Sequence, residues 1–200
     1  MNCTIPVAHF ANVHFVTPQL AIGGDLSSRD DTLALLQLTE LSQLGVTHVV
    51  DARIEWSDER LFERRAPEIS YLHHGLDDAG QRVPASWFET AVSWFETAMA
   101  VDPEAIVLTH CHMGINRGPS LGFAVLLAQG WDAVEAIAEI RAARPQANVW
   151  YAVDALHWHQ GRTGVDAGTA AAQHEELDWW RRANPLDVVR LIREQRARGE

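Results

Sequence analysis

The stretch AIVLTHCHMGINRGPS, residues 105–120, combines an apolar run, a short polar loop and the start of a helix. Residues 105–110 have the length and composition of a buried strand. Pro119 is typical of the first turn of a helix, expected here over residues 120–129 and ended by Gly130. A strand that runs through a tight loop into a helix is the repeating unit of α/β proteins.

The same alternation continues on both sides of this stretch. Further strands are expected over residues 18–24, 46–50 and 69–73. Further helices are expected over residues 31–44, 86–99, 132–143 and 149–157. The helix from Ser86 is predicted to begin in a capping box with Glu89. We therefore predict an α/β fold with a central, mainly parallel sheet of four to five strands flanked by helices.

The chain of 200 residues, with 47% hydrophobic and 22% charged side chains, fits one globular core. Residues 1–160 are predicted to form the main domain. Residues 161–200, which start with glycines and small residues, are predicted to be a C-terminal helical extension packed on or extending that domain. The charged stretch 53–65 is expected to be an exposed loop or short helix.

The charge balance bears on the possible partners. A formal net charge of -11 disfavours nucleic acid, because phosphate backbones are bound by clustered basic residues. No apolar stretch is long enough to span a membrane. The two cysteines, Cys3 and Cys111, cannot form a framework of several disulfides, and the chain starts without a leader-like apolar run. A reduced, cytoplasmic protein is expected.

Cys111 and Arg117 are separated by five residues in the loop between strand and helix. In such a loop, successive backbone N–H groups can converge on one point, to which the helix N-terminus adds its positive dipole end. Gly114 allows a sharp turn, and Arg117 offers a planar fork to two phosphoryl oxygens. The spacing predicts a phosphate-binding loop made of His112, Met113, Gly114, Ile115, Asn116 and Arg117.

The positive field of this loop favours a thiolate at Cys111, which is then a nucleophile able to form a cysteinyl-phosphate. The departing alcohol needs a proton from a carboxylic acid held over the loop. Asp77 and Asp78 are candidates, because they lie in a glycine-bounded loop and each disfavours ionisation of the other.

Supporting roles are expected for neighbouring residues. His110 is expected to order the loop through a hydrogen bond, His112 to face solvent, and Trp56 to line the mouth of the site. A zinc site at His110, Cys111 and His112 is rejected, because the second spaced ligand pair of structural zinc sites is missing. No metal and no cofactor are expected.

The motif His-Cys-x-x-Gly-x-x-Arg at residues 110–117 resembles the signature of the protein tyrosine phosphatase superfamily. Residues 17–23 and 44–50 resemble the opening strands of its dual-specificity branch, and the likeness covers roughly residues 15–158. The resemblance implies that Cys111 is the nucleophile, that Arg117 binds phosphate and that Asp78 is the general acid.

The chain departs from this family at Gly118, where the family usually has Ser or Thr, whose hydroxyl helps the thiolate leave. Ser120 is the residue expected to substitute in part. The expected function is hydrolysis of phosphomonoesters, on phosphotyrosine or also phosphoserine and phosphothreonine in proteins. Two alternatives stay open. One is a phosphatase of small molecules or RNA 5′ ends, since Asn116-Arg117 resembles the RNA-phosphatase branch; the other is a slow-turnover, phosphate-binding pseudophosphatase.

Overall fold

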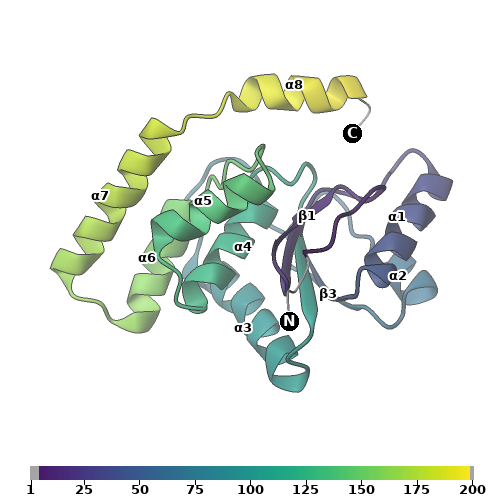
Figure 1. Cartoon of the computed structure of the whole chain (residues 1–200), viewed down its shortest axis with the longest axis horizontal. Coiled ribbons are helices and arrows are strands. Elements are labelled where there is room, and N and C mark those ends of the chain that lie inside the picture. The colour runs from purple at the N-terminus through teal and green to yellow at the C-terminus, as the bar shows by residue number, and fades with distance from the viewer. Residues whose placement is uncertain (1–4, 199–200) are drawn as a thin grey trace.

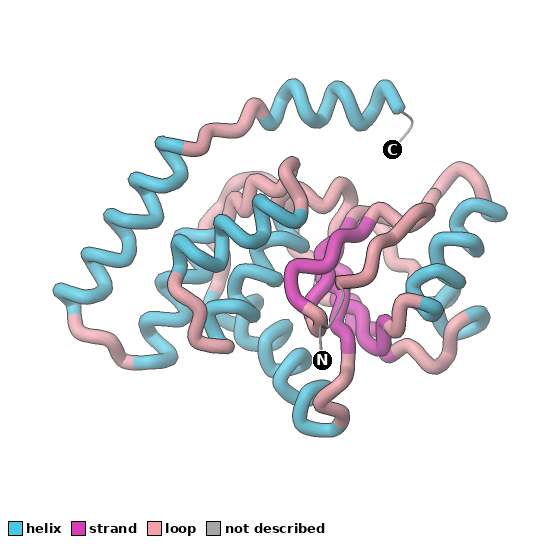
Figure 2. The backbone as a smooth tube through the Cα atoms, in the orientation of Figure 1, coloured by secondary structure: helices cyan, strands magenta, loops and turns pink. Residues whose placement is uncertain are grey.

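A computed structural model of the chain describes residues 5–198, so Cys3 lies outside the described residues. Its centre is a five-stranded sheet (Figures 1 and 2). The strands are β1 (Val13–Thr17), β2 (Leu20–Gly23), β3 (Val46–Asp51), β4 (Ser70–His73) and β5 (Ile106–His110). Their order in space is β1-β2-β5-β3-β4, and only β1 and β2 pair antiparallel. The predicted mainly parallel α/β sheet is confirmed.

Helices cover both faces of the sheet (Figure 1). They are α1 (Asp31–Gln43), α2 (Glu59–Arg65), α3 (Ala85–Val101), α4 (Arg117–Ala128), α5 (Ala133–Ala143), α6 (Ala152–Thr163), α7 (Ala167–Ala183) and α8 (Val188–Arg198). One core cluster joins the sheet to α1 and α2, and a second joins the opposite face to α3, α4, α5 and α6.

Helix α4 occupies the centre of the second layer. It packs against β2 and β5 and against α3, α5 and α6. All residues from Arg117 to Leu127 are buried, which explains why this helix is apolar around its whole circumference. The packing fixes the N-terminus of α4 directly beside the C-terminal end of β5, where Cys111 follows.

Some predicted boundaries are wrong. Strand β1 was not predicted. Helix α3 begins at Ala85 after Pro84, and no side chain caps it, so the capping box of Ser86 and Glu89 does not form. Helix α4 begins at Arg117, three residues earlier than expected, because Pro119 can occupy any position of the first turn where its missing N–H is not needed.

The C-terminal segment forms two helices. Helix α7 packs on α5 and α6, and its Leu177 is fully buried in the core. The proposed domain boundary at residue 160 falls inside α6. Helix α8 follows after a short connection and crosses above the body in the view of Figure 1. Among the described helices, none is both long and apolar enough to cross a membrane.

Candidate active site

Cys111 directly follows β5 and is 2% exposed, on the floor of the loop that leads into α4. The loop turns at Gly114, which has φ 63°, in the left-handed region that glycine tolerates. A Cβ atom at this position would stand 2.6 Å from the carbonyl oxygen of Gly23. Gly114 is therefore required both by its backbone conformation and by the space around it.

Four successive carbonyl groups of this loop face outward, and each accepts a hydrogen bond from outside it. The donors are the N–H of Asp25 to His112 O (3.0 Å), Arg144 Nη2 to Met113 O (3.0 Å), Arg144 Nε to Gly114 O (2.7 Å) and the N–H of Asn148 to Ile115 O (2.8 Å). In a trans peptide the N–H points opposite to the carbonyl. The N–H groups of residues 113–116 therefore face the inside of the loop, as an anion cradle requires.

The N-terminus of α4 adds to this cradle. Its N-cap residue, Asn116, makes no side-chain capping bond to the first turn. The first-turn N–H groups of a helix carry the positive end of the helix dipole and need an external acceptor. An anion in the loop would supply one.

Arg117 is almost fully buried and held by an acidic residue that the sequence did not single out. Its Nη1 and Nη2 donate to the two carboxylate oxygens of Glu55 at 2.9 and 2.8 Å, and Nη1 also donates to Leu76 O at 2.8 Å. The hydrogen bonds from Arg117 lower the pKa of Glu55 to about 2. Glu55 thus stays ionised at neutral pH and fixes the guanidinium plane.

The other edge of the Arg117 guanidinium is differently placed. Its Nε atom is buried and has no hydrogen-bond acceptor among the residues that the structure describes. Burial disfavours the Arg117 cation, yet Glu55 and the neighbouring Cys111 outweigh burial and raise its pKa. A buried, charged donor without an acceptor is costly, and a phosphoryl oxygen would satisfy it.

The two candidate acids are placed differently. The carboxylate of Asp78 accepts from Asn116 Nδ2 at 3.2 Å and lies 3.8 Å from Arg117 Nε. It also accepts from the Tyr151 hydroxyl at 2.8 Å. Asp77 contributes its backbone carbonyl, which accepts from Gln81 Nε2 at 2.6 Å. Of the two carboxylates, the structure brings that of Asp78 to the loop.

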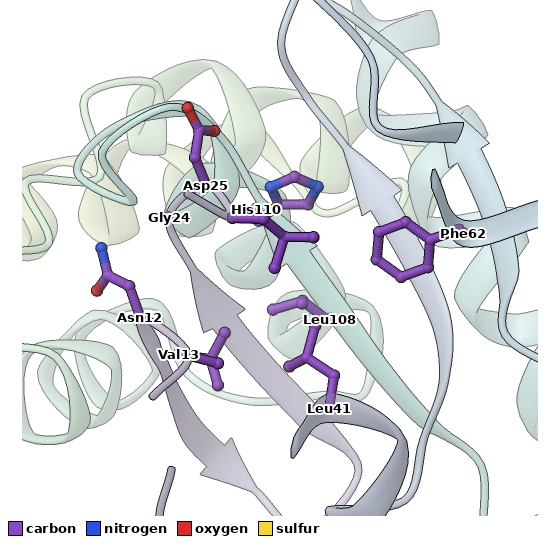
Figure 3. A pocket seen from close by; sticks show the side chains of 10 residues that line it. Asn12, Val13, Gly24, Asp25, Leu41, Phe62, Leu108 and His110 are labelled. Carbon is purple, nitrogen blue, oxygen red and sulfur yellow. The ribbon is translucent and has the colours of Figure 1, made fainter. Parts of the chain in front are cut away.

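His110 does not order the loop in the predicted way. It is buried, and neither ring nitrogen has a hydrogen-bond partner among the described residues. Its Nε2 lies 3.7 Å from Asp51 Oδ1, while the ring lines a small cavity together with Asp25 and apolar side chains (Figure 3). Burial lowers the pKa of His110, which keeps the ring neutral. The expected hydrogen bond is missing because the strand carries the ring into this apolar cavity and away from the loop.

His112 is exposed to solvent, as predicted. Its side chain is 45% exposed, but Nδ1 lies 2.6 Å from Asp25 Oδ2. The ring also packs edge-on against Trp56, with 5.2 Å between the ring centroids. Trp56 therefore lies at the rim of the loop as predicted, next to the exposed ring of His112.

A buried ionic cluster supports this rim from below. Arg53 was expected in an exposed loop, yet its side chain is 0% exposed. It donates to Asp51, Asp25 and Asp58 at 2.7–2.8 Å. Asp25 in turn contacts His112, so the cluster connects strand β3 to the loop. Arg53 is buried because three carboxylates converge on it and together compensate its lost hydration.

Gly118 lacks the family's hydroxyl and also has no room for one. A Cβ atom here would stand 2.9 Å from the backbone Cα and carbonyl carbon of His110. Ser120 does not replace that hydroxyl, because its Oγ donates to Asn116 O at 2.7 Å and accepts the N–H of Tyr151 at 3.2 Å. The expected substitution by Ser120 is therefore not seen, since its only proton is used within α4.

We predict that Gly118→Ala destabilises the protein by about 1–3 kcal/mol, because the backbone of β5 must shift to admit a methyl group. Gly161→Ala in α6 is a matched control, since nothing lies within 4 Å of the new methyl group. Both changes increase helix propensity, so the control is expected to gain about 0.5–1 kcal/mol. Urea unfolding measures both values, and equal changes in the two variants would contradict the clash.

Three site residues were missed in the sequence: Glu55, Arg144 and Tyr151. Arg144 is fully buried and donates to Met113 O and Gly114 O. Each contacts the phosphate loop, Arg117 or Asp78 from a distant part of the chain, and none belongs to a recognisable local motif. An alternation of charge around residue 55 is the only local signal, and it also fits an exposed loop.

Comparison with known proteins supports the sequence resemblance. No protein-family model matches the chain. It is 30% identical over 131 residues to human dual specificity protein phosphatase 13B, across 64% of this chain and 63% of that protein. The match thus spans less than two thirds of the relative's length.

Solved structures share the fold. The crystal structure of human DUSP28 matches with a TM-score of 0.62 at 19% identity, over 80% of this chain and 99% of that one. A mouse putative dual specificity phosphatase, crystallised with zinc tungstate, matches with a TM-score of 0.62 at 21% identity, over 80% and 94% of the two chains. The chain is thus similar in sequence to a dual specificity phosphatase and shares the fold of these solved structures, in agreement with the signature resemblance at residues 110–117.

Proposed function

We propose that this chain is a cysteine-dependent phosphomonoester hydrolase of the dual-specificity kind. The observation that carries the proposal is the hydrogen bonding of the buried Arg117 guanidinium. Glu55 holds one edge of its guanidinium, while Nε is buried without an acceptor among the described residues. Together with the inward N–H groups of residues 113–116, this edge fits the oxygens of a phosphoryl group.

In the proposed first step, Cys111 Sγ attacks phosphorus and an S–P bond forms as the P–O bond to the alcohol breaks. The loop N–H groups and Arg117 stabilise the charge on the phosphoryl oxygens in the transition state. Asp78 donates a proton to the departing oxygen. In the second step Asp78 accepts a proton from water, which attacks phosphorus and releases Cys111 as the thiolate.

An aryl phosphate is the substrate class that we favour. Trp56 at the rim is 38% exposed, and Trp150, which is 49% exposed, lies beside Gly80 of the aspartate loop (residues 75–80). Exposed tryptophans beside the phosphate loop and the aspartate loop suit a phosphotyrosine ring. The absence of lysine in the chain argues against substrates that carry several phosphates.

The direct test is turnover of p-nitrophenyl phosphate by the purified chain, followed by a comparison of phosphotyrosine, phosphoserine and phosphothreonine peptides. Inhibition by tungstate, an oxyanion that resembles phosphate, should be competitive. The proposal fails if the wild-type chain shows no hydrolysis that depends on Cys111.

A second candidate function is phosphate binding with very slow turnover, and Gly118 favours it. Ser120 does not replace the missing hydroxyl, because its own hydroxyl donates to Asn116 O. Burst kinetics distinguish the two functions. Release of one equivalent of alcohol followed by almost no further release indicates a phosphate-binding protein with very slow turnover, and steady release indicates an enzyme.

We predict that Asp78→Ala lowers kcat/KM for p-nitrophenyl phosphate by about 10²–10⁴-fold, the usual contribution of a general acid. Asp77→Ala is the matched control, since only the backbone carbonyl of Asp77 makes the hydrogen bonds described above. It should retain kcat/KM close to that of the wild type. A large loss in Asp77→Ala with none in Asp78→Ala would reverse the assignment.

A further inference from the structure

Tyr151 connects the body of the protein to the aspartate loop. The residue directly precedes α6 and is 1% exposed. Its hydroxyl lies 2.8 Å from Asp78 Oδ1, 3.5 Å from Asp77 O and 3.3 Å from the N–H of Gly80. A phenol has one proton, and the shortest of these contacts, to the carboxylate, is the one that receives it. The N–H of Gly80 then donates to the phenol oxygen.

The two oxygens of Asp78 therefore have different surroundings. Oδ1 accepts from Tyr151, while Oδ2 accepts from Asn116 Nδ2 at 3.2 Å and is the oxygen nearest to Arg117 Nε. The amide of Asn116 is held in this orientation, because its Oδ1 accepts from Asn148 Nδ2 at 3.1 Å. Oδ2 is thus the oxygen that faces the phosphate site.

We propose that Tyr151 is a positioning residue for the general acid: its hydroxyl occupies Oδ1 of Asp78, so that the transferable proton resides on Oδ2, toward the leaving oxygen. This inference rests on the proposed function. When the P–O bond breaks, its electron pair stays on the departing oxygen, which takes the proton from Oδ2. The hydrogen bond from Tyr151 then stabilises the negative charge left on the carboxylate.

The burial of Tyr151 supports this role. Burial and the hydrogen bond to Asp78 together raise the pKa of Tyr151, so the phenol keeps its proton over the range of pH in which such an enzyme is assayed. The ring itself packs edge-on against Trp87, with 6.4 Å between the ring centroids. A phenylalanine can keep this packing and lose only the hydroxyl.

The test is Tyr151→Phe with two substrates that differ in their need for an acid. Phenyl phosphate has a poor leaving group and needs the proton, whereas dinitrophenyl phosphate leaves without it. We expect kcat/KM for phenyl phosphate to fall by about 10- to 100-fold, the value of one hydrogen bond to a charged group. For dinitrophenyl phosphate it should stay close to the wild-type value.

Two comparisons exclude a merely structural effect. In Asp78→Ala, adding Tyr151→Phe should cause no further loss, because the hydroxyl acts through the carboxylate. Trp158→Phe in α6 also removes one hydrogen bond, from Trp158 Nε1 to Glu89 at 2.9 Å, and should change the two substrates equally. Melting curves of all variants show whether each one folds cooperatively.

The outcomes separate this inference from the proposed function. A wild-type chain without hydrolysis that depends on Cys111 overturns both. An active wild type in which Tyr151→Phe loses the same factor on both substrates, or adds its full loss to that of Asp78→Ala, overturns only the role of Tyr151.

Discussion

Cys111→Ser is expected to lower kcat/KM for p-nitrophenyl phosphate by more than about 10⁴-fold, the scale of removing a catalytic nucleophile. Cys111 is buried directly after β5, at the start of the loop, and it acts electrostatically on Arg117. A serine hydroxyl is almost entirely protonated at neutral pH, so it is too weak a nucleophile to replace the Cys111 thiolate in the first step. The volumes of the two side chains are similar, and the fold should be retained.

The same variant should still bind oxyanions, because the loop N–H groups and Arg117 are unchanged. Tungstate is expected to raise the melting temperatures of the variant and of the wild type alike, since a ligand that binds only the native state stabilises it. Cys3→Ser is the matched control, as Cys3 is the other cysteine of the chain and lies outside the described residues. If Cys3→Ser abolishes hydrolysis, or Cys111→Ser leaves it intact, the assigned nucleophile is wrong.

The sequence predicts the loop itself because its defining groups are local. Cys111, Gly114 and Arg117 lie within seven consecutive residues between an apolar strand and an apolar helix. Chain connectivity alone therefore places these three groups in one turn, whatever the rest of the fold does. The parallel sheet is predictable for a related reason: the alternation of strands and helices leaves few other ways to bury both kinds of element.

The partners of the loop could not be predicted, because they come from distant segments. Glu55 meets Arg117 across 62 residues, and Arg144 meets Gly114 across 30. Tyr151 meets Asp78 across 73 residues. Their side chains are ordinary for a surface loop or a helix end, and only the tertiary packing selects their partners. The residues alone left Asp77 and Asp78 open, the family resemblance favoured Asp78, and these contacts support that choice.

Burial of charged side chains is the second reason why part of the site could not be predicted from the sequence. Residues 53–65 contain many charged side chains, and such a composition is typical of an exposed segment. The prediction fails at Arg53 because Asp25, from a segment 28 residues away, joins the nearby Asp51 and Asp58 around its guanidinium. Each of these acids alone would also be expected at the surface, so the cluster appears only when the strands are assembled.

Arg53→Met is expected to lower the free energy of unfolding at pH 7 by about 3–5 kcal/mol, because it leaves buried carboxylates without their counter-charge. Asp51 bears most of this loss, since its side chain is 0% exposed and Arg53 Nε and Nη2 donate to both of its oxygens at 2.7 Å. Arg162→Met is the control. It removes a double contact with Glu96 between partly exposed side chains and should cost less than about 1 kcal/mol.

The direction in which the stability difference changes with pH follows from the pKa of Asp51. Burial raises the pKa of Asp51, but the hydrogen bonds and charge of Arg53, together with the hydrogen bond from Tyr71, outweigh burial and hold that pKa below its usual range. The wild type therefore gains stability from Asp51 above the unfolded pKa of about 3.9 and loses it as the pH falls below that value. Without Arg53, burial favours the protonated form of Asp51, so the variant is destabilised at pH 7 and regains stability as the pH falls.

Urea unfolding at pH 7 and near pH 4.5 should show that the difference in unfolding free energy between wild type and Arg53→Met narrows at the lower pH. A difference that is constant with pH, or no larger than that of Arg162→Met, would mean that the charge of Arg53 does not hold this cluster together. Because Asp25 joins the cluster to His112, Arg53→Met should also weaken the protection that tungstate gives, which ties the stability of β3 to the shape of the loop.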